Sequence, residues 1–248
     1  MKKEYGQHFL VDRNILDVIG RLAELGPDDV VLEIGPGQGV LTRYLADRVR
    51  RVHAVEIDRA LEPALTGLGD NVDVVFGDAL RLELPQDATK LVANLPYNIA
   101  TPLVVESLDG LANVRLWGVM VQREVADRFF AQPGTKEYGA VSVLVQLAAE
   151  RTGFHPVSRT VFRPQPNVDS ALVAFRRTDL PADYGQVKEL VTAAFAHRRK
   201  TLPNSVAQAG LAAREEAAAA LAAIGRPAET RAEALAPGEF VALAGALR

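Results

Sequence analysis

The chain has 248 residues and a formal net charge of −3, and it contains no cysteine and only four scattered histidines. The missing thiols exclude disulfides, thiolate metal sites and a cysteine nucleophile, and the histidines form no ligand cluster, so we expect no metal. No apolar run approaches the length of about 18 residues that spans a bilayer, and the first residues lead into no apolar signal-peptide core. We therefore expect a cytoplasmic protein.

Short apolar runs alternate with helical stretches over the first two-thirds of the chain. This alternation predicts a parallel sheet covered by helices, which is an α/β fold. The predicted strands are 30–34, 52–56, 72–76, 90–93 and 116–121, with later strands within 159–175, and the predicted helices are 40–49, 123–130 and 140–149.

The glycine-rich segment Glu33–Gly39 lies between a predicted strand and a predicted helix. Glycines there let the backbone turn tightly and approach a ligand closely. Glu56 ends the next strand, where a carboxylate can accept hydrogen bonds from ribose hydroxyls. The spacing is Gly-x-Gly-x-Gly rather than the Gly-x-Gly-x-x-Gly of dinucleotide sites, so no pyrophosphate is required. A plain glycine turn before a helix is the alternative interpretation.

Asp78 ends the third predicted strand, at the same sheet edge as Glu56. A carboxylate in this place can accept a hydrogen bond from the amino group of an adenine ring. One acid for a ribose and one for an adenine, beside a glycine turn, favour an adenosine carrier without phosphates, and S-adenosylmethionine is the common one. By itself, Asp78 is more typical of a helix cap or a turn.

The tetrapeptide Asn94-Leu95-Pro96-Tyr97 follows the fourth predicted strand. The N6 atom of adenine is a weak nucleophile, because its lone pair is delocalised into the ring. The Asn94 side-chain carbonyl and a backbone carbonyl near Leu95 or Pro96 could accept both amino protons, which stabilises the positive charge that forms on nitrogen. Tyr97 offers a flat face for stacking. Asn and Pro also favour ordinary turns, but the two acids nearby favour chemistry.

The composition changes after residue 177. From residue 187 onward the chain is rich in alanine, and Pro and Gly residues divide it into short predicted helices. We place a domain boundary near residue 178, which gives an α/β domain over 1–178 and a small all-helical domain over 179–248. Residues 151–210 carry nine Lys and Arg against four Asp and Glu. This basic stretch suits a polyanion, although a solvated surface is the simpler interpretation of charge alone.

Eight segments, spread over nearly the whole chain, carry recognisable motifs. They are residues 6–10, 33–39, 55–58, 77–79, 94–98, 121–126, 162–170 and 195–202. Together they resemble the ribosomal RNA adenine dimethyltransferases, and among these the bacterial small-subunit enzymes. The resemblance implies a Rossmann-like S-adenosylmethionine-dependent methyltransferase domain followed by a small helical domain. It also implies dimethylation of N6 in two adjacent adenines, in a hairpin loop near the 3′ end of 16S rRNA.

The resemblance assigns roles to individual residues. The cofactor-binding positions are His8, Leu10, Gly35, Gly37, Glu56, Asp78 and Asn94. The catalytic positions are Asn94, Pro96, Tyr97 and Phe162. The RNA-binding positions are Arg123, Arg198, Arg199 and Lys200. Phe162 would sandwich the base opposite Tyr97, and a buried strand aromatic is its alternative interpretation. The expected partner is 16S rRNA within the small ribosomal subunit or its late precursor, and the expected state is a monomer.

Three other functions compete with this prediction. The related large-subunit adenine methyltransferase, which confers macrolide resistance, shares the Asn-x-Pro-Tyr motif. A non-catalytic ribosome assembly factor could keep the same fold, but the intact acids and Asn94 argue against lost catalysis. A nicotinamide oxidoreductase is disfavoured by the glycine spacing and by the Asn94–Tyr97 element, which has no role in hydride transfer.

Overall fold

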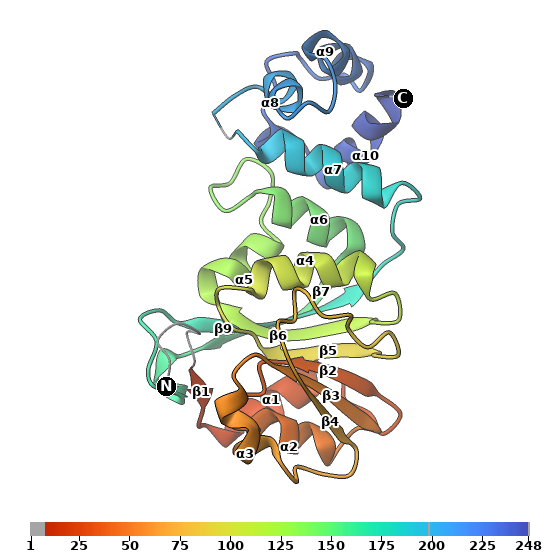
Figure 1. The fold of residues 1–248 in the computed structure, drawn as a ribbon. Coiled ribbons are helices and arrows are strands. Elements are labelled where there is room, and N and C mark those ends of the chain that lie inside the picture. The colour runs from red at the N-terminus through yellow and green to blue at the C-terminus, as the bar shows by residue number, and fades with distance from the viewer. Residues whose placement is uncertain (1–7, 198, 248) are drawn as a thin grey trace. The chain divides into compact units, whose positions relative to one another are not determined.

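The computed structural model describes residues 8–197 and 199–247 (Figure 1). These residues divide into two compact units. The first unit extends to Ala126 and resumes with Glu150–Arg177, and the second holds Asp127–Ala149 and the chain from Thr178 onward. Among the described residues, no helix combines the length and the apolar composition needed to cross a membrane.

A seven-stranded sheet forms the centre of the first unit, counted over the described residues, with strand order β4-β3-β2-β5-β6-β9-β7. Neighbouring strands from β4 to β6 run parallel, and β9 runs antiparallel to β6. The strands are β2 (Val30–Ile34), β3 (Arg51–Glu56), β4 (Val72–Phe76), β5 (Lys90–Asn94), β6 (Leu116–Gln122), β7 (Ala149–Val157) and β9 (Ser170–Arg177). The chain order reverses between β2 and β5, and such a point leaves a crevice at the carboxyl ends of the strands.

Helices cover both faces of this sheet (Figure 1). One face packs against α1 (Arg13–Leu22) and α2 (Val40–Ala46), whose apolar side chains join those of the strands in a buried core. The other face carries α4 (Ala100–Gly110), where the Trp117 indole nitrogen donates to the Ser107 hydroxyl at 2.8 Å. The short elements η2 (Arg59–Leu61) and α3 (Glu62–Leu65) follow β3.

The start of the described chain pairs with a segment that is distant in the sequence. Strand β1 (Phe9–Leu10) pairs antiparallel with β8 (Phe162–Arg163), which follows η3 (Arg159–Val161). The Val11 amide extends this pairing by donating to the Val161 carbonyl at 2.9 Å. The pairing places β1 along one side of the crevice.

The second unit is helical. It holds α6 (Ala140–Ala148), α7 (Tyr184–Phe195), α8 (Leu202–Gln208), α9 (Arg214–Ala223), η4 (Ala232–Ala234) and α10 (Pro237–Ala246), while α5 (Arg123–Phe129) crosses from the first unit. The Tyr138 hydroxyl donates to the Leu235 carbonyl at 2.7 Å, and burial raises the pKa of this tyrosine, so it stays protonated. Phe195 packs against Phe240, with ring centroids 5.9 Å apart. These aromatic contacts form the core of the unit.

The observed strands agree closely with the prediction. Two strands, 30–34 and 72–76, have the predicted bounds, and β3, β5 and β6 each differ by one residue. The predicted helix over 40–49 is too long, because α2 ends at Ala46 and Asp47 caps it. The Arg48 and Val49 amides both donate to the Leu45 carbonyl in the turn that follows, and Val49 packs in the core.

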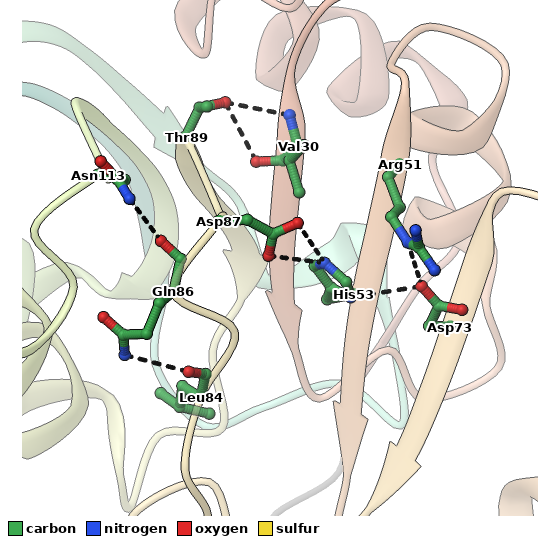
Figure 2. Close-up of polar contacts among 9 residues, drawn as sticks. All are labelled: Val30, Arg51, His53, Asp73, Leu84, Gln86, Asp87, Thr89 and Asn113. Carbon is green, nitrogen blue, oxygen red and sulfur yellow. Dashed lines mark hydrogen bonds and ion pairs between the residues drawn. The ribbon is translucent and has the colours of Figure 1, made fainter.

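Polar side chains form a connected network at the amino ends of the strands, shown in Figure 2. We call Arg51, His53, Asp73 and Asp87 the amino-end network. Asp73 bonds the Arg51 guanidinium, which holds the pKa of that carboxyl below its ordinary value. His53 lies between two acids, with Nδ1 3.4 Å from Asp73 Oδ2 and Nε2 3.1 Å from Asp87 Oδ1. Nearby, the Asn113 amide donates to the Gln86 carbonyl at 2.7 Å.

Candidate active site

A cavity opens at the other end of the strands, beside the reversal of strand order. Its open space is about 1000 Å³, including the mouth. Five segments line it: 8–10, 33–41 without Gly39, 55–57, 77–79 and 94–99. They come from β1, the turn after β2, and the ends of β3, β4 and β5. This place and size suit a nucleoside-sized ligand.

The glycine turn allows two other walls of the cavity to come close. Gly35 has φ 74° and Gly37 has φ 58°, in the left-handed region that favours glycine. A Cβ atom on Gly37 would lie 2.9 Å from the Phe9 ring, and one on Gly35 would lie 3.0 Å from Pro96. Side chains at these positions would therefore push away β1 and the Asn94–Tyr97 turn.

Glu56 connects this turn to the end of β3. Its Oε2 accepts from the Gly37 amide at 3.1 Å, and its Oε1 accepts from the Asp58 amide at 2.9 Å. Each carboxylate oxygen has a second lone pair for a ligand hydroxyl. Asp78 lies at the end of the next strand, where Oδ1 accepts from the Leu80 amide at 3.0 Å. Both acids line the cavity and have their orientation set by backbone amides.

Glu33 supplies a buried acceptor on the cavity wall. Its side chain is 1% exposed, and within the described chain its Oε2 has no hydrogen-bond partner. Burial, assisted by the charge of Glu56, raises the pKa of Glu33 to about 8. A buried acceptor without a donor is costly, so a ligand that brings a cation or a hydrogen-bond donor fits this position. Together with the backbone of the glycine turn, which lines the same cavity, it fits the amino-acid and ribose parts of S-adenosylmethionine.

The Asn94–Tyr97 turn is held at both ends. The Asn94 amide nitrogen donates to the His8 carbonyl at 3.1 Å, which orients the group and leaves its Oδ1 oxygen as an acceptor. The Leu95 amide donates to the Met120 carbonyl at 3.0 Å, and the Ile99 amide donates to the Pro96 carbonyl at 3.1 Å. Three hydrogen bonds therefore hold the Asn94–Tyr97 turn in place.

Tyr97 lies half-buried in the same wall. Its hydroxyl is 2.7 Å from the Ser170 hydroxyl, and its ring centroid is 5.5 Å from that of His8, at an angle of 32°. The His8 Nδ1 atom in turn lies 2.8 Å from the Pro164 carbonyl oxygen. Burial raises the pKa of Tyr97, so the phenol stays neutral at physiological pH.

Most of the expected site residues meet in this cavity. Those that line it are His8, Leu10, Gly35, Gly37, Glu56, Asp78, Asn94, Pro96 and Tyr97. Phe162 does not line it, because its side chain is 0% exposed in the core beside α1. Ile57, 46% exposed on the cavity wall, was not predicted. Its position directly after Glu56, the acid that ends β3, is the feature of the sequence that could have indicated it.

The expected RNA contacts lie in both units. The Arg123 guanidinium is 4.8 Å from the centre of the Phe154 ring. Arg199 and Lys200 are exposed in the second unit, where Lys200 bonds the Gln208 side chain. Arg198 lies outside the described residues.

Two further arginines of the basic stretch lie in η3 and in β8, the strand that pairs with β1. The Arg159 guanidinium donates to the Asn167 carbonyl and that of Arg163 donates to the Phe162 carbonyl, both at 3.0 Å. Both side chains are exposed, and Arg163 is the register partner of Phe9 in β1. Backbone carbonyls therefore hold both guanidinium groups at the surface.

Solved structures have the same fold. A dimethyladenosine transferase from Plasmodium falciparum superposes with a TM-score of 0.79 at 25% identity, covering 95% of this chain and 96% of that one. A 23S rRNA methyltransferase, ErmE, superposes with a TM-score of 0.67 at 31% identity, covering 96% and 99%. The Rossmann-like methyltransferase fold with a helical C-terminal part is thus confirmed.

Sequence relatives agree along nearly the whole chain. The family model described as ribosomal RNA adenine dimethylase matches residues 1–244. A protein from Rubrobacter xylanophilus, named ribosomal RNA small subunit methyltransferase A, is 49% identical and aligns with 98% of this chain and 93% of its own length. A protein of that name from Streptomyces coelicolor is 45% identical, with 98% and 89% covered. The chain therefore belongs to the ribosomal RNA adenine dimethylase family.

Proposed function

We propose that this chain uses S-adenosylmethionine to dimethylate N6 of two adjacent adenines in a hairpin loop near the 3′ end of 16S rRNA. One observation carries the proposal: the Asn94–Tyr97 turn lines the same cavity as Glu56 and Asp78. A group that activates an adenine amino nitrogen therefore lies beside two acids suited to an adenosine carrier. The names of the curated relatives support the small subunit as the source of the RNA.

Each residue of the cavity is assigned to one part of the cofactor. Glu56 would accept from the ribose hydroxyls, and Asp78 would accept from the adenine amino group. The glycine turn would pass close to the chain that joins the ribose to the amino-acid part. The Glu33 carboxyl, which its raised pKa keeps protonated near neutral pH, would accept from the ammonium group through its carbonyl oxygen. The apolar Ile57 side chain covers one face of the adenine ring. His8 and Leu10 close the cavity from the side of β1. Bound S-adenosylmethionine supplies an activated methyl group on a sulfonium.

Asn94 makes the target nitrogen reactive. Its Oδ1 oxygen and a backbone carbonyl of the turn accept the two amino protons of the target adenine. These hydrogen bonds strengthen as positive charge forms on N6, so they stabilise the transition state more than the ground state. The N6 lone pair would form the new N–C bond as the bond from the methyl carbon to the sulfonium sulfur breaks and S-adenosylhomocysteine leaves, and the proton that the nitrogen then loses would pass to water. No general base is required, and positioning supplies the rest of the rate.

Stacking and charge bring the adenine to the cavity. An unpaired loop base costs only a few kcal/mol to extrude, and stacking on Tyr97 offsets about 1–3 kcal/mol of this. Arg159 and Arg163 hold phosphates next to β1, and Arg123 does so nearby. The substrate is the assembled small subunit or its late precursor in the cytoplasm, bound by a monomer, because so small a protein reads RNA shape rather than a long sequence.

The test is methyl transfer from tritium-labelled S-adenosylmethionine to purified small and large subunits from a strain that lacks the modification. We expect label in the small subunit alone, recovered as N6,N6-dimethyladenosine after nucleoside analysis. Label in the large subunit would instead favour a 23S rRNA methyltransferase, the type of the ErmE structure. Cofactor binding without any transfer would leave a non-catalytic assembly factor.

The cluster Arg198, Arg199 and Lys200 has a separate test. Replacing all three by Ala removes cations that we place on phosphates, so ribosome binding should weaken and its salt dependence should become shallower. Filter binding of labelled small subunits across a salt series measures both. A slope equal to that of the unaltered protein would mean that the cluster is an ordinary solvated surface.

A further inference from the structure

Ser170 is a buried residue that the proposed mechanism does not use. It is the first residue of β9, it is 1% exposed, and its hydroxyl oxygen lies 2.7 Å from the Tyr97 hydroxyl oxygen. The two residues are 73 positions apart in the chain. Ser170 begins β9 and Tyr97 lies in the turn after β5, and β6 lies between these two strands in the sheet. The hydrogen bond therefore spans the edge of the sheet beside the cavity.

This bond fixes the part of Tyr97 that the backbone does not control. The turn holds the Cα end of the side chain through the Leu95 and Ile99 amides. A tyrosine side chain then keeps two torsions, and anchoring the hydroxyl at its far end restricts both. His8 lies on the same ring, with centroids 5.5 Å apart. Of these contacts, only the one to Ser170 sets the direction of the phenol axis.

We infer that Ser170 is a positioning residue for methyl transfer, whose hydroxyl holds the Tyr97 ring in the plane on which the target adenine stacks. The inference rests on the proposed function. A displaced ring would displace the adenine amino group from Asn94, and small errors in the position of a reacting group cost large factors in rate. Ser170 does not line the cavity, so it acts through Tyr97 and contacts neither the cofactor nor the base.

The first unit contains a matched control. Ser107 is 2% exposed, and its hydroxyl likewise bonds an aromatic side chain, accepting from Trp117 Nε1 at 2.8 Å. Neither Ser107 nor Trp117 lines the cavity. Ser107→Ala therefore removes the same kind of buried bond without touching the site. It separates loss of stability from loss of positioning.

The experiment measures kcat and KM for small subunits together with the Kd for S-adenosylmethionine. Ser170→Ala should lower kcat at least tenfold and leave the cofactor Kd within twofold, because the cofactor side of the cavity is unchanged. Ser170→Thr keeps the hydroxyl and should restore most of kcat. Ser107→Ala should lower the melting temperature and leave kcat within twofold. A kcat of Ser170→Ala within twofold of the unaltered protein overturns the inference.

A double variant tests whether Ser170 acts through Tyr97. Tyr97→Phe removes the other partner of the bond, so the double variant Tyr97→Phe with Ser170→Ala should be no slower than the slower single variant. Multiplied losses would mean that the two hydroxyls act separately, which overturns the inference. The measured rates alone decide this comparison.

A second measurement separates this inference from the proposed function. An RNA hairpin with 2-aminopurine at the target position reports stacking by loss of its fluorescence, with no methyl transfer required. The unaltered protein should quench it, and Ser170→Ala should quench it less. If the unaltered protein transfers no methyl group, the proposed function fails, and the quenching still decides the role of Ser170. Equal quenching by both proteins overturns that role.

Discussion

The two ends of the central sheet treat polar side chains in opposite ways. At the amino ends, Arg51, His53, Asp73 and Asp87 contact one another and are partly exposed (Figure 2). At the carboxyl ends, Glu33 is fully buried with an oxygen that no described residue contacts. Buried polar groups are normally satisfied, because an unmade hydrogen bond costs free energy. The contrast teaches that the residues of the amino-end network satisfy one another, while the carboxyl end keeps a buried oxygen that a ligand could satisfy.

The largest expected effect comes from a pair of asparagines, one at each end of the sheet. Asn94 and Asn113 each donate from the side-chain amide to a backbone carbonyl, one in each region. Asn94→Ala should lower methyl transfer by about 10³-fold, the loss typical of a transition-state acceptor or donor. Asn113→Ala should leave it unchanged. Transfer assays on small subunits, with circular dichroism to check the fold, measure both; near-normal turnover of Asn94→Ala would disprove the mechanism.

The buried acid should make stability depend on pH. The folded pKa of Glu33, about 8, lies above its ordinary value of 4.5. The folded state therefore holds a proton that the unfolded state has lost, and this contribution is complete below pH 4.5 and disappears as the pH rises through 8. We expect the free energy of unfolding to fall by up to about 5 kcal/mol over that window, at about 1.4 kcal/mol per pKa unit.

Glu33→Gln is the control for this effect. It keeps the shape of the side chain and cannot ionise, so its urea unfolding should lose the pH dependence between pH 5 and 9 that we assign to Glu33. Parallel pH profiles for the two proteins would mean that Glu33 is ionised in the folded cavity.

A smaller effect is expected from crowding the glycine turn. Gly37→Ala adds a Cβ atom 2.9 Å from the Phe9 ring, at a backbone φ of 58°. We expect about tenfold weaker binding of S-adenosylmethionine in calorimetry, because β1 must move from the cavity. Gly67→Ala has a similar φ of 71° with no atom within 4 Å of the new Cβ. It imposes the same backbone strain, so equal binding losses in the two variants would remove the role of Phe9.

The smallest effect concerns the amino-end network. Asp73→Asn removes the partner of Arg51, and exposed pairs of this kind contribute at most about 1 kcal/mol. Because the pKa of Asp73 is lowered, its contribution is present above the ordinary value of 3.8 and is lost as the pH falls below it. Thermal unfolding from pH 3 to 7 should show that the melting temperature of the variant falls slightly less toward low pH than that of the unaltered protein. Methyl transfer should be unchanged. A loss of transfer would mean that the two sheet ends are coupled.

Much of the site could be predicted because local patterns carry it. Glu56 and Asp78 end predicted strands, and the carboxyl ends of parallel strands meet at one edge of a sheet. The strands could be predicted from apolar runs, because a strand that is buried on both faces of a sheet needs apolar side chains along its whole length. Helices α1 and α4 and strand β7 were not predicted. The helix proposed over 140–149 ends at Ala148, and the next residue already begins β7, since helix and strand patterns join there without a turn residue.

The sequence by itself determined the parallel α/β fold, the glycine turn, the acids at the strand ends and the Asn94–Tyr97 turn, since these depend on neighbours within a few residues. Only the tertiary structure decided that Phe162 lies in the core, that Glu33 has a buried oxygen without a partner, and that Ser170 bonds Tyr97. The physical reason is separation along the chain. The path of β1 against β8, and of β9 beside β6, brings together residues whose spacing in sequence carries no periodic signal.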